Sequence, residues 1–371
     1  MDFEFSTEQE QLRDAIDKWV KKAYTFENRR QIVNESGYSN LMWSEMANLG
    51  LCGLYIPSKF DGMDMGPVEV MVAMQALGSG MVLEPIMQSW ICSAVLNAFA
   101  QEEMKTEWLP KMANGEAKVA LAYQEAGSRY KLDYCKTKAV FDGKTWRLTG
   151  VKSLVPFGEN GTAFIVSAII NSEINLFLVE KSAEALFYRT YLLQEGSLSC
   201  DIELSNTPAR LLTEEGQAAL ELAVDIGNAA SCAEAVGVMD KTLTLTIDYL
   251  NTRKQFGVSL NSFQALRHRL ADMKMQLELS RSMSYYASLK LNDPAPQRRI
   301  AMSRAKYQIG RSMRLVGQEG IQMHGGIGMT DEYIMSHYFK KLTQIELTFG
   351  DTMHHLGYVS DHMQDTAGVF V

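Results

Sequence analysis

This chain lacks closely spaced cysteine pairs, and their absence argues against a small domain held together by disulfide bonds. The five cysteines lie far apart, none belongs to a C-x-x-C pair, and their odd number fits no closed set of disulfides. Scattered reduced thiols are typical of cytoplasmic proteins, so we expect the chain to be cytoplasmic. The five are Cys52, Cys92, Cys135, Cys200 and Cys232.

An excess of basic residues is also missing, because 36 lysines and arginines face 44 acidic residues and give a net charge of −8. This balance argues against nucleic acid as a partner. It also requires that a site for a phosphate-bearing ligand be locally basic or rich in backbone amides. The acidic first five residues lack a signal-peptide pattern, and no apolar run approaches a membrane span, so no membrane partner is expected.

The spacing of apolar residues divides the chain into three parts. Helical spacing predominates over residues 1–118, and a period of two with Gly, Asn and Asp turns follows over residues 119–212. Residues 213–371 carry long helical segments with short joints, which are typical of a bundle. The predicted fold class is therefore mainly α with a central β domain. The expected bundle segments are 214–250, 260–292, 296–325 and 331–365.

Two short runs in the last part suit a dinucleotide cofactor. The first, Tyr249–Gly257, is followed by Phe263-Gln264, and the second is Gln322–Gly328. The arginine of the first run matches the charge of a pyrophosphate, and the adjacent glycines of the second let backbone amides approach it closely. Together the runs favour a flavin dinucleotide.

The two runs, in this order, resemble the acyl-CoA dehydrogenase family, and the three-part order resembles that family's architecture over essentially the whole chain. The resemblance implies a helical N-terminal domain, a β-barrel-like middle domain and a C-terminal four-helix bundle. It also implies FAD as cofactor, an acyl-CoA thioester as substrate and electron-transfer flavoprotein as electron acceptor. His324 is expected to order its loop, since no second ligand stands at metal spacing. The residues that resemble FAD contacts made across a subunit interface are Arg253, Phe256, Gln264, Gln322, Gly325 and Gly326.

Two further runs resemble the family's flavin-facing loops in altered form. Gln124–Arg129 resembles Thr-Glu-Pro-x-Ala-Gly-Ser-Asp and keeps Ser128 as an expected FAD contact, although its first and last residues differ from the motif. Gly150–Pro156 resembles Gly-x-Lys-x-Trp-Ile-Thr, with leucine and proline in place of the Trp and the Thr. Because proline has no backbone N–H, a plausible donor to the flavin is lost. The resemblance therefore implies that this chain's own flavin pocket is altered.

The reaction of this family needs a base that removes a proton from the carbon next to the thioester. The family keeps a glutamate at one of two positions, and these correspond to Phe349 and Gly227, neither of which can accept a proton. The family arginine after the second position corresponds to Asn228. Two acids stand nearby: Asp351 is a candidate replacement base, and Asp225 is expected to be an exposed helix residue.

The chain thus keeps residues that resemble contacts lent to a neighbour's FAD and has lost those that resemble contacts to its own flavin and substrate. This pattern resembles the small subunit of heteromeric, pimeloyl-CoA dehydrogenase-like bacterial enzymes, which act on dicarboxylic or steroid-derived acyl-CoAs. Our leading hypothesis is a subunit of an α,β-dehydrogenating heterotetramer whose related partner chain supplies the base. Two alternatives stay open: a self-sufficient homotetramer that uses Asp351, and a non-catalytic scaffold with the same fold. A flavin oxidase of nitroalkane type would also need a base, and no residue singles it out.

Overall fold

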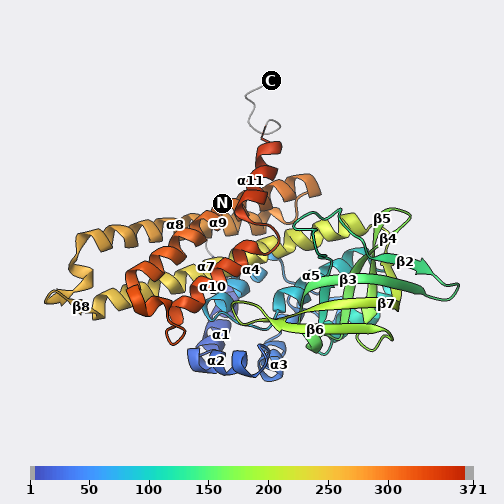
Figure 1. Ribbon diagram of the computed structural model, residues 1–371, viewed down its shortest axis with the longest axis horizontal. Helices are drawn as coiled ribbons and strands as arrows, with labels where there is room; N and C mark the ends of the chain where they lie inside the picture. Colours follow the sequence, from blue (N-terminus) through green and yellow to red (C-terminus); the bar gives the residue numbers. More distant parts are fainter. Residues whose placement is uncertain (1–4, 364–371) are drawn as a thin grey trace. The chain divides into compact units, whose positions relative to one another are not determined.

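The computed structural model describes residues 5–363, whose helices and strands are labelled in Figure 1. They form two units. Unit 1 combines the chain up to Arg29 with Pro67–Val82 and everything from Asn228 onward, and unit 2 combines Arg30–Gly66 with Leu83–Gly227. The boundary between the units therefore passes through α7 (Gly216–Thr252) and α2 (Phe26–Glu35). The division into three consecutive domains, 1–118, 119–212 and 213–371, stays a prediction.

Unit 2 is built around one sheet of seven strands. The strand order is β1-β4-β2-β3-β7-β5, with β6 paired to β7, and β4 also pairs with β5. This last pairing closes β4, β2, β3, β7 and β5 into a ring, which gives the middle domain its barrel-like character. The strands are β1 (Val119–Ala122), β2 (Lys138–Phe141), β3 (Trp146–Pro156), β4 (Ala163–Ile170), β5 (Glu173–Glu180), β6 (Leu186–Leu192) and β7 (Leu198–Thr213).

The apolar strands β4 and β5 form the core of this sheet, since they pair antiparallel along their whole length and bury most of their side chains. The helices of the unit are α3 (Asn40–Asn48), α5 (Ile86–Phe99) and α6 (Glu102–Ala113). The period of two predicts strands over 119–123, 136–141, 146–151, 164–170 and 174–179, but it predicts neither β6 nor β7. The sequence Asn206-Thr207-Pro208 within β7 has the composition of a turn, and it forms a bulge at which β7 shifts its register against β3.

Unit 1 is helical, and two of its helices meet backbone to backbone. A Cβ added at Gly237 of α7 would lie 1.9 Å from the carbonyl oxygen of Gln75, so only glycine permits this approach to α4 (Pro67–Ser79). At the start of the described chain, Ser6 and Gln9 form a capping box for α1 (Thr7–Ala23). Besides residues 228–252 of α7, the unit contains α1 (Thr7–Ala23), α4 (Pro67–Ser79), α8 (Gln264–Lys290), α9 (Ala295–His324), α10 (Ile334–Leu347) and α11 (Thr352–Asp361).

The expected fourth long segment of the bundle, 331–365, is two helices, and its last two residues lie outside the described part. α10 ends at Leu347 because Phe349 and Gly350 both have positive φ, 58° and 121°, which is incompatible with continuing a right-handed helix. α11 then starts at Thr352. The predicted fold class is confirmed, since helical first and last parts flank a central β part.

One helix of the described residues, α7, is long and apolar enough to cross a membrane, with a hydropathy of 1.2 over its best window. This finding corrects the expectation that no apolar run approaches a membrane span. Of that window, 94% is buried inside the chain. The core helix of a helical bundle has the same length and composition, so the helix is weak evidence for a membrane.

Candidate functional site

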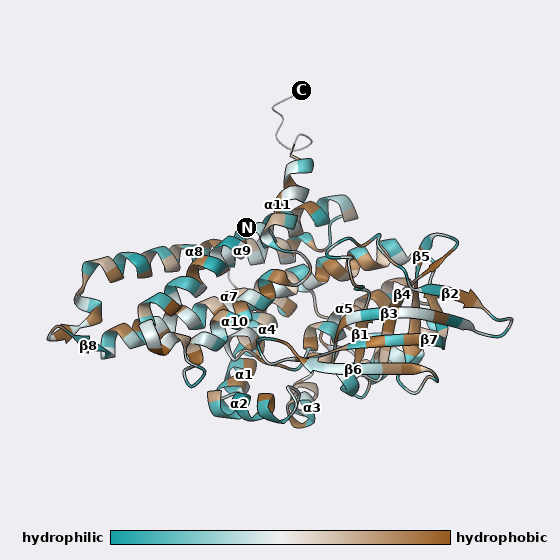
Figure 2. Cartoon of the chain, viewed as in Figure 1, coloured by the Kyte–Doolittle hydropathy of each residue, from teal (hydrophilic) through white to brown (hydrophobic). Residues whose placement is uncertain are grey.

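The end of the bundle carries the first group of predicted site residues. After α7 ends, the chain forms a hairpin of β8 (Lys254–Gln255) and β9 (Val258–Ser259) and then enters α8. Arg253 lies at the base of this hairpin, Phe256 at its tip and Gln264 at the first position of α8, and all three are exposed. Figure 2 shows hydrophobic colour on this hairpin, at the outer end of the long helices.

Phe256 occupies a strained and exposed position. Phe256 and Gly257 have φ angles of 53° and 81°, so both central residues of the turn are left-handed, as in a type I′ hairpin. A left-handed conformation costs a residue other than glycine about 1–2 kcal/mol. Phe256 is nevertheless 89% exposed, and its ring contacts Phe263 edge-on at 6.1 Å between centroids. The chain does not bury this ring, so the ring is available to contact another molecule.

The second predicted run lies where α9 ends. Gln322, Gly325 and Gly326 are all exposed. Gly325 has φ 64° and ψ −142°, a conformation that favours glycine, whereas Gly326 does not have a positive φ. In the described structure, no atom lies within 4 Å of a Cβ built on either residue. Internal packing therefore does not explain Gly326, and the space beside both glycines is open to another molecule.

Side-chain contacts bring these two runs to one end of unit 1. The ring of Tyr249, near the end of α7, stacks on that of His324, the last residue of α9, with centroids 4.4 Å apart and planes at 29°. Arg269 of α8 forms an ion pair with Glu319 of α9, which places the start of α8 beside the end of α9. The six predicted contacts gathered at this exposed bundle end are Arg253, Phe256, Gln264, Gln322, Gly325 and Gly326.

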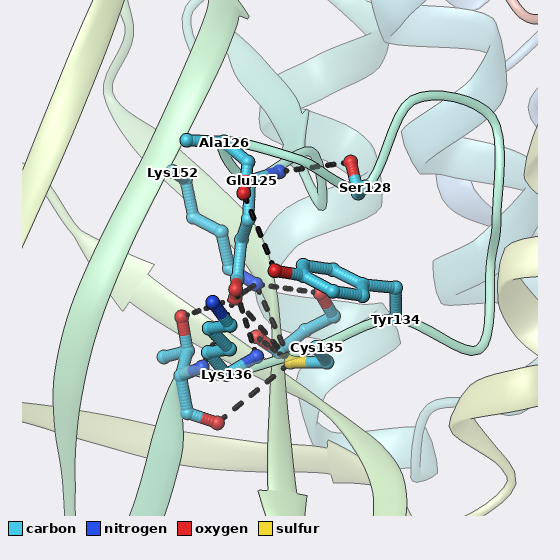
Figure 3. Close-up of polar contacts among 9 residues, drawn as sticks. Glu125, Ala126, Ser128, Tyr134, Cys135, Lys136 and Lys152 are labelled. Carbon is cyan, nitrogen blue, oxygen red and sulfur yellow. Dashed lines mark hydrogen bonds and ion pairs between the residues drawn. The ribbon is translucent and has the colours of Figure 1, made fainter.

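A buried ion pair in unit 2 joins the two altered loop motifs, as Figure 3 shows. Nζ of Lys152 lies 2.7 Å from Oε1 of Glu125, and both residues are buried. The carboxylate also accepts the N–H groups of Lys136 and Thr137, at 2.7 and 3.0 Å, and the Thr137 hydroxyl at 2.7 Å. Burial alone would raise the pKa of Glu125, but the lysine and these hydrogen bonds outweigh burial and lower the pKa to about 2.

Ser128 lies inside the Gln124–Arg129 loop. It is 4% exposed, and its hydroxyl accepts the N–H of Glu125 at 3.3 Å. The carbonyl of Gln124 accepts the N–H of Ser153 at 2.9 Å, which joins this loop to β3. Arg129, which replaces the acid of the family motif, is exposed with a φ of 48°. The loop is therefore ordered by its own contacts, and the contact of Ser128 with FAD stays a prediction.

The end of β3 offers few free hydrogen-bond donors. The N–H of Leu154 donates to Oη of Tyr191 at 3.2 Å, and that hydroxyl donates to Asp201 at 2.9 Å. Pro156 has no N–H to offer. Sequence reasoning missed Tyr191 and Asp201, because their meeting depends on the register in which β6 pairs with β7, and no local signal fixes that register.

Both positions that correspond to the family base lack an ionisable group. Phe349 is 8% exposed in the turn between α10 and α11, and Gly227 lies within α7. The expectation that Asp225 is exposed is wrong, since it is 3% exposed. The physical reason is that α7 is buried all round, at every residue from 223 to 239. Asn228 is 2% exposed, and its Oδ1 has no hydrogen-bond partner among the described residues.

The turn that holds Phe349 is fixed from both sides. Asp351 is the N-cap of α11, and its carboxylate accepts the N–H of His354 at 2.7 Å. Lys306, which sequence reasoning missed, donates from Nζ to the carbonyls of Ile345 and Thr348 at 2.7 and 2.6 Å. Burial lowers the pKa of Lys306 to about 8. The signal that could have revealed it is weak: the residues three and four positions away on the same helix face (Met302, Ser303, Ile309 and Gly310) are all uncharged.

The histidines of α11 do not form a metal site. No group of three or more His, Cys, Asp and Glu side chains within residues 5–363 could hold a metal ion. His355 is 3% exposed, and its Nδ1 lies 3.2 Å from the Ser303 hydroxyl. Burial, with a smaller effect of nearby positive charge, lowers the pKa of His355 to about 2, so the ring is neutral.

Family models match both helical parts of the chain. The model of the acyl-CoA dehydrogenase N-terminal domain matches residues 6–116, and that of the acyl-CoA dehydrogenase C-terminal domain matches residues 214–363. The chain belongs to the acyl-CoA dehydrogenase family, whose members are FAD-dependent oxidoreductases that act on the CH–CH bond of acyl-CoA.

Known relatives and solved structures agree with this assignment. L-prolyl-(peptidyl-carrier protein) dehydrogenase of Pseudomonas fluorescens is 28% identical over 312 residues, which cover 78% of this chain and 81% of that protein. A variant of the Tcur3481-Tcur3483 steroid ACAD is 26% identical with a TM-score of 0.89, over 97% of this chain and 98% of that chain. The ChsE4-ChsE5 complex from Mycobacterium tuberculosis shares the fold, with 23% identity and a TM-score of 0.90 over 99% and 100% of the chains.

FAD is the cofactor of this family, and the residues described above fit it unequally. The bundle end fits, because it presents the exposed Arg253 and open backbone at Gly325 and Gly326. The end of β3 does not fit a flavin held by backbone donors, because the Leu154 N–H is already bonded and Pro156 has none. The bundle end therefore carries groups that suit FAD, and the end of β3 lacks free backbone donors for a flavin, while contact with FAD at either place stays a prediction.

Proposed function

We propose that this chain is one subunit of a hetero-oligomeric acyl-CoA dehydrogenase that forms an α,β double bond in a CoA thioester. Its bundle end contacts FAD bound to a related partner subunit, and the partner supplies the catalytic base. The observation that carries this proposal is that neither position of the family base holds an acid. The buried Phe349 stands at one position and Gly227 at the other. A chain without either carboxylate has no positioned group to accept the α proton.

The exposed bundle end supports the cofactor part of the proposal. The guanidinium of Arg253 can match a pyrophosphate with two parallel hydrogen bonds. The backbone at Gly325 and Gly326 leaves space for a second group of the same cofactor. The left-handed, 89% exposed Phe256 at the tip of the hairpin suits a ring that packs on another subunit.

The similar solved structures support the hetero-oligomeric part. Two of them are named for two different chains each: the Tcur3481-Tcur3483 steroid ACAD and the ChsE4-ChsE5 complex. In the proposed complex, bound FAD supplies the hydride acceptor, and electron-transfer flavoprotein takes the electrons onward. We place this complex in the cytoplasm, as a heterotetramer that acts on fatty or steroid-derived acyl-CoA.

Purification of the chain with and without a related, glutamate-bearing dehydrogenase chain tests the proposal. The chain alone should give no dye reduction with acyl-CoA thioesters, and the co-purified pair should be active. Arg253→Ala in this chain should weaken FAD retention by the pair, whereas Arg304→Ala, on the part of α9 away from the bundle end, should not. Full activity of the chain by itself would refute the proposal.

A self-sufficient homotetramer that uses Asp351 is the second candidate, since this carboxylate stands two residues from Phe349. Aspartate is one methylene shorter than glutamate, and a misplacement of about 1 Å can reduce a rate by about a hundredfold. Asp351 also already caps α11. If co-expression with a related dehydrogenase chain yields no FAD-containing complex, the result favours a non-catalytic scaffold with the same fold.

A further inference from the structure

Three aromatic rings lie together directly behind the exposed bundle end. They are Tyr249 near the end of α7, His324 at the end of α9 and Tyr333 just before α10. The ring centroid of His324 lies 4.4 Å from that of Tyr249 and 5.3 Å from that of Tyr333, so the three rings form a triangular cluster. The two tyrosine rings are 6.4 Å apart. The rings therefore join three segments that are distant in sequence.

The hydrogen bonding of His324 defines its state. Its Nδ1 lies 2.7 Å from the carbonyl oxygen of Gly320, so Nδ1 carries the proton and donates. The residue is 3% exposed, and burial lowers its pKa from the ordinary value. Its Nε2 is buried and makes no hydrogen bond of normal geometry among the described residues, although the backbone of Leu245 on α7 also raises the pKa of the ring against the effect of burial. The neutral ring thus presents a flat surface to both tyrosines and faces the backbone of α7.

Two of the three rings adjoin segments that carry predicted FAD contacts. The backbone carbonyl of Tyr249 accepts the backbone N–H of Arg253 at 2.8 Å, so Tyr249 lies one helical turn before Arg253 at the end of α7. His324 directly precedes Gly325, which is exposed and has no packing neighbour for a side chain. Helix ends and exposed glycine loops are the parts of a fold that open most easily. The ring contact therefore lies where it can restrict local opening of the ends of α7 and α9.

We infer that His324 is a positioning residue, whose ring holds the ends of α7 and α9 together so that Arg253 and the Gly325-Gly326 pair reach one cofactor. This inference rests on the proposed function, because the cofactor is the FAD of the partner subunit. It adds a residue that need not touch FAD itself. The rings act one turn beyond Gly320, where α9 already packs closely on Thr242 of α7, and so extend this contact to the helix ends.

Two variants of His324 separate the ring from its hydrogen bond. His324→Ala removes the stack, whereas His324→Phe keeps a flat ring and loses the bond to Gly320. Ile309→Ala is the matched control, because Ile309 is fully buried in α9 fifteen residues earlier, about 22 Å along the helix. This control lowers stability without touching the bundle end.

The first measurement is hydrogen exchange of the isolated full-length chain, which needs neither FAD nor partner. We expect His324→Ala to speed exchange in both 253–263 and 325–330, and His324→Phe to leave it within about twofold of the parent, since the ring contact is retained. Unchanged exchange in His324→Ala overturns the inference. Equal losses in the Phe and Ala variants overturn it as well, because the hydrogen bond would then hold the helix ends.

The second measurement is the FAD dissociation constant of the co-purified complex. We expect His324→Ala to raise it about tenfold, as for one weakened charge-assisted contact, and Ile309→Ala to leave it unchanged despite a lower Tm. If His324→Ala loosens both segments but leaves FAD binding intact, the positioning role stands and the proposed contact with the partner's FAD fails. The two proposals can therefore fail separately.

Discussion

The hydroxyl of Tyr191 accepts the backbone N–H of Leu154 at 3.2 Å and so occupies a donor at the end of β3 where the family motif faces the flavin. With proline at 156, this strand end lacks two backbone donors. We predict that the isolated chain retains no flavin and that the complex holds one FAD for every two chains. Absorbance of released flavin against protein concentration measures this ratio. Tyr191→Phe should not change it, because Pro156 remains; one FAD per chain would contradict the prediction.

Removal of Lys152 should be strongly destabilising, because it leaves the Glu125 carboxylate buried without its positive partner. We expect Lys152→Ala to lower the free energy of unfolding by about 3–5 kcal/mol. The double variant Lys152→Met, Glu125→Gln removes both charges and should lose clearly less. Urea unfolding of all three proteins at pH 7 provides the comparison. Equal losses in the single and double variants would show that the charge pair is unimportant.

Asp351→Asn should have a small effect on both stability and activity. Asparagine caps helices about as well as aspartate, so the N–H of His354 keeps its acceptor. Asp351→Ala removes that acceptor and should lower stability by about 1 kcal/mol. Turnover of the complex with acyl-CoA should stay within about twofold of the parent for the Asn variant, because the partner supplies the base. Loss of turnover in Asp351→Asn with unchanged Tm would instead support the homotetramer.

Features that depend on a local residue pattern could be predicted from the sequence, whereas contacts and burial that depend on tertiary packing could not. The change of period at residue 119 was sufficient to predict the fold class, which is confirmed, whereas the cofactor contact predicted from the two runs around Arg253 and Gly325 stays a prediction. The meeting of Tyr191 with Asp201 could not be predicted, because it requires the register of two strands that were not themselves singled out. The burial of Asp225 likewise follows from the position of α7 in the core, which an amphipathic pattern cannot report for a helix buried all round.

The buried, neutral His355 should make stability depend on pH below neutrality. Its pKa is about 2 in the folded chain, against an ordinary value of about 6.5 in the unfolded chain. The unfolded state therefore binds a proton as pH falls through 6.5 while the folded state does not, so the free energy of unfolding falls. Lys306, His354 and Arg299 all disfavour a positive charge on His355.

Between pH 7 and pH 5 this one residue should remove about 2 kcal/mol of stability. The Glu125 carboxylate does not contribute to that loss, because its pKa is lowered to about 2 and its effect starts only below its ordinary pKa of about 4.3. Urea unfolding at the two pH values measures the difference, and His355→Gln should reduce it, since glutamine binds no proton in this range. A pH dependence that is the same in parent and His355→Gln would mean that His355 is protonated, or exposed, in the folded protein.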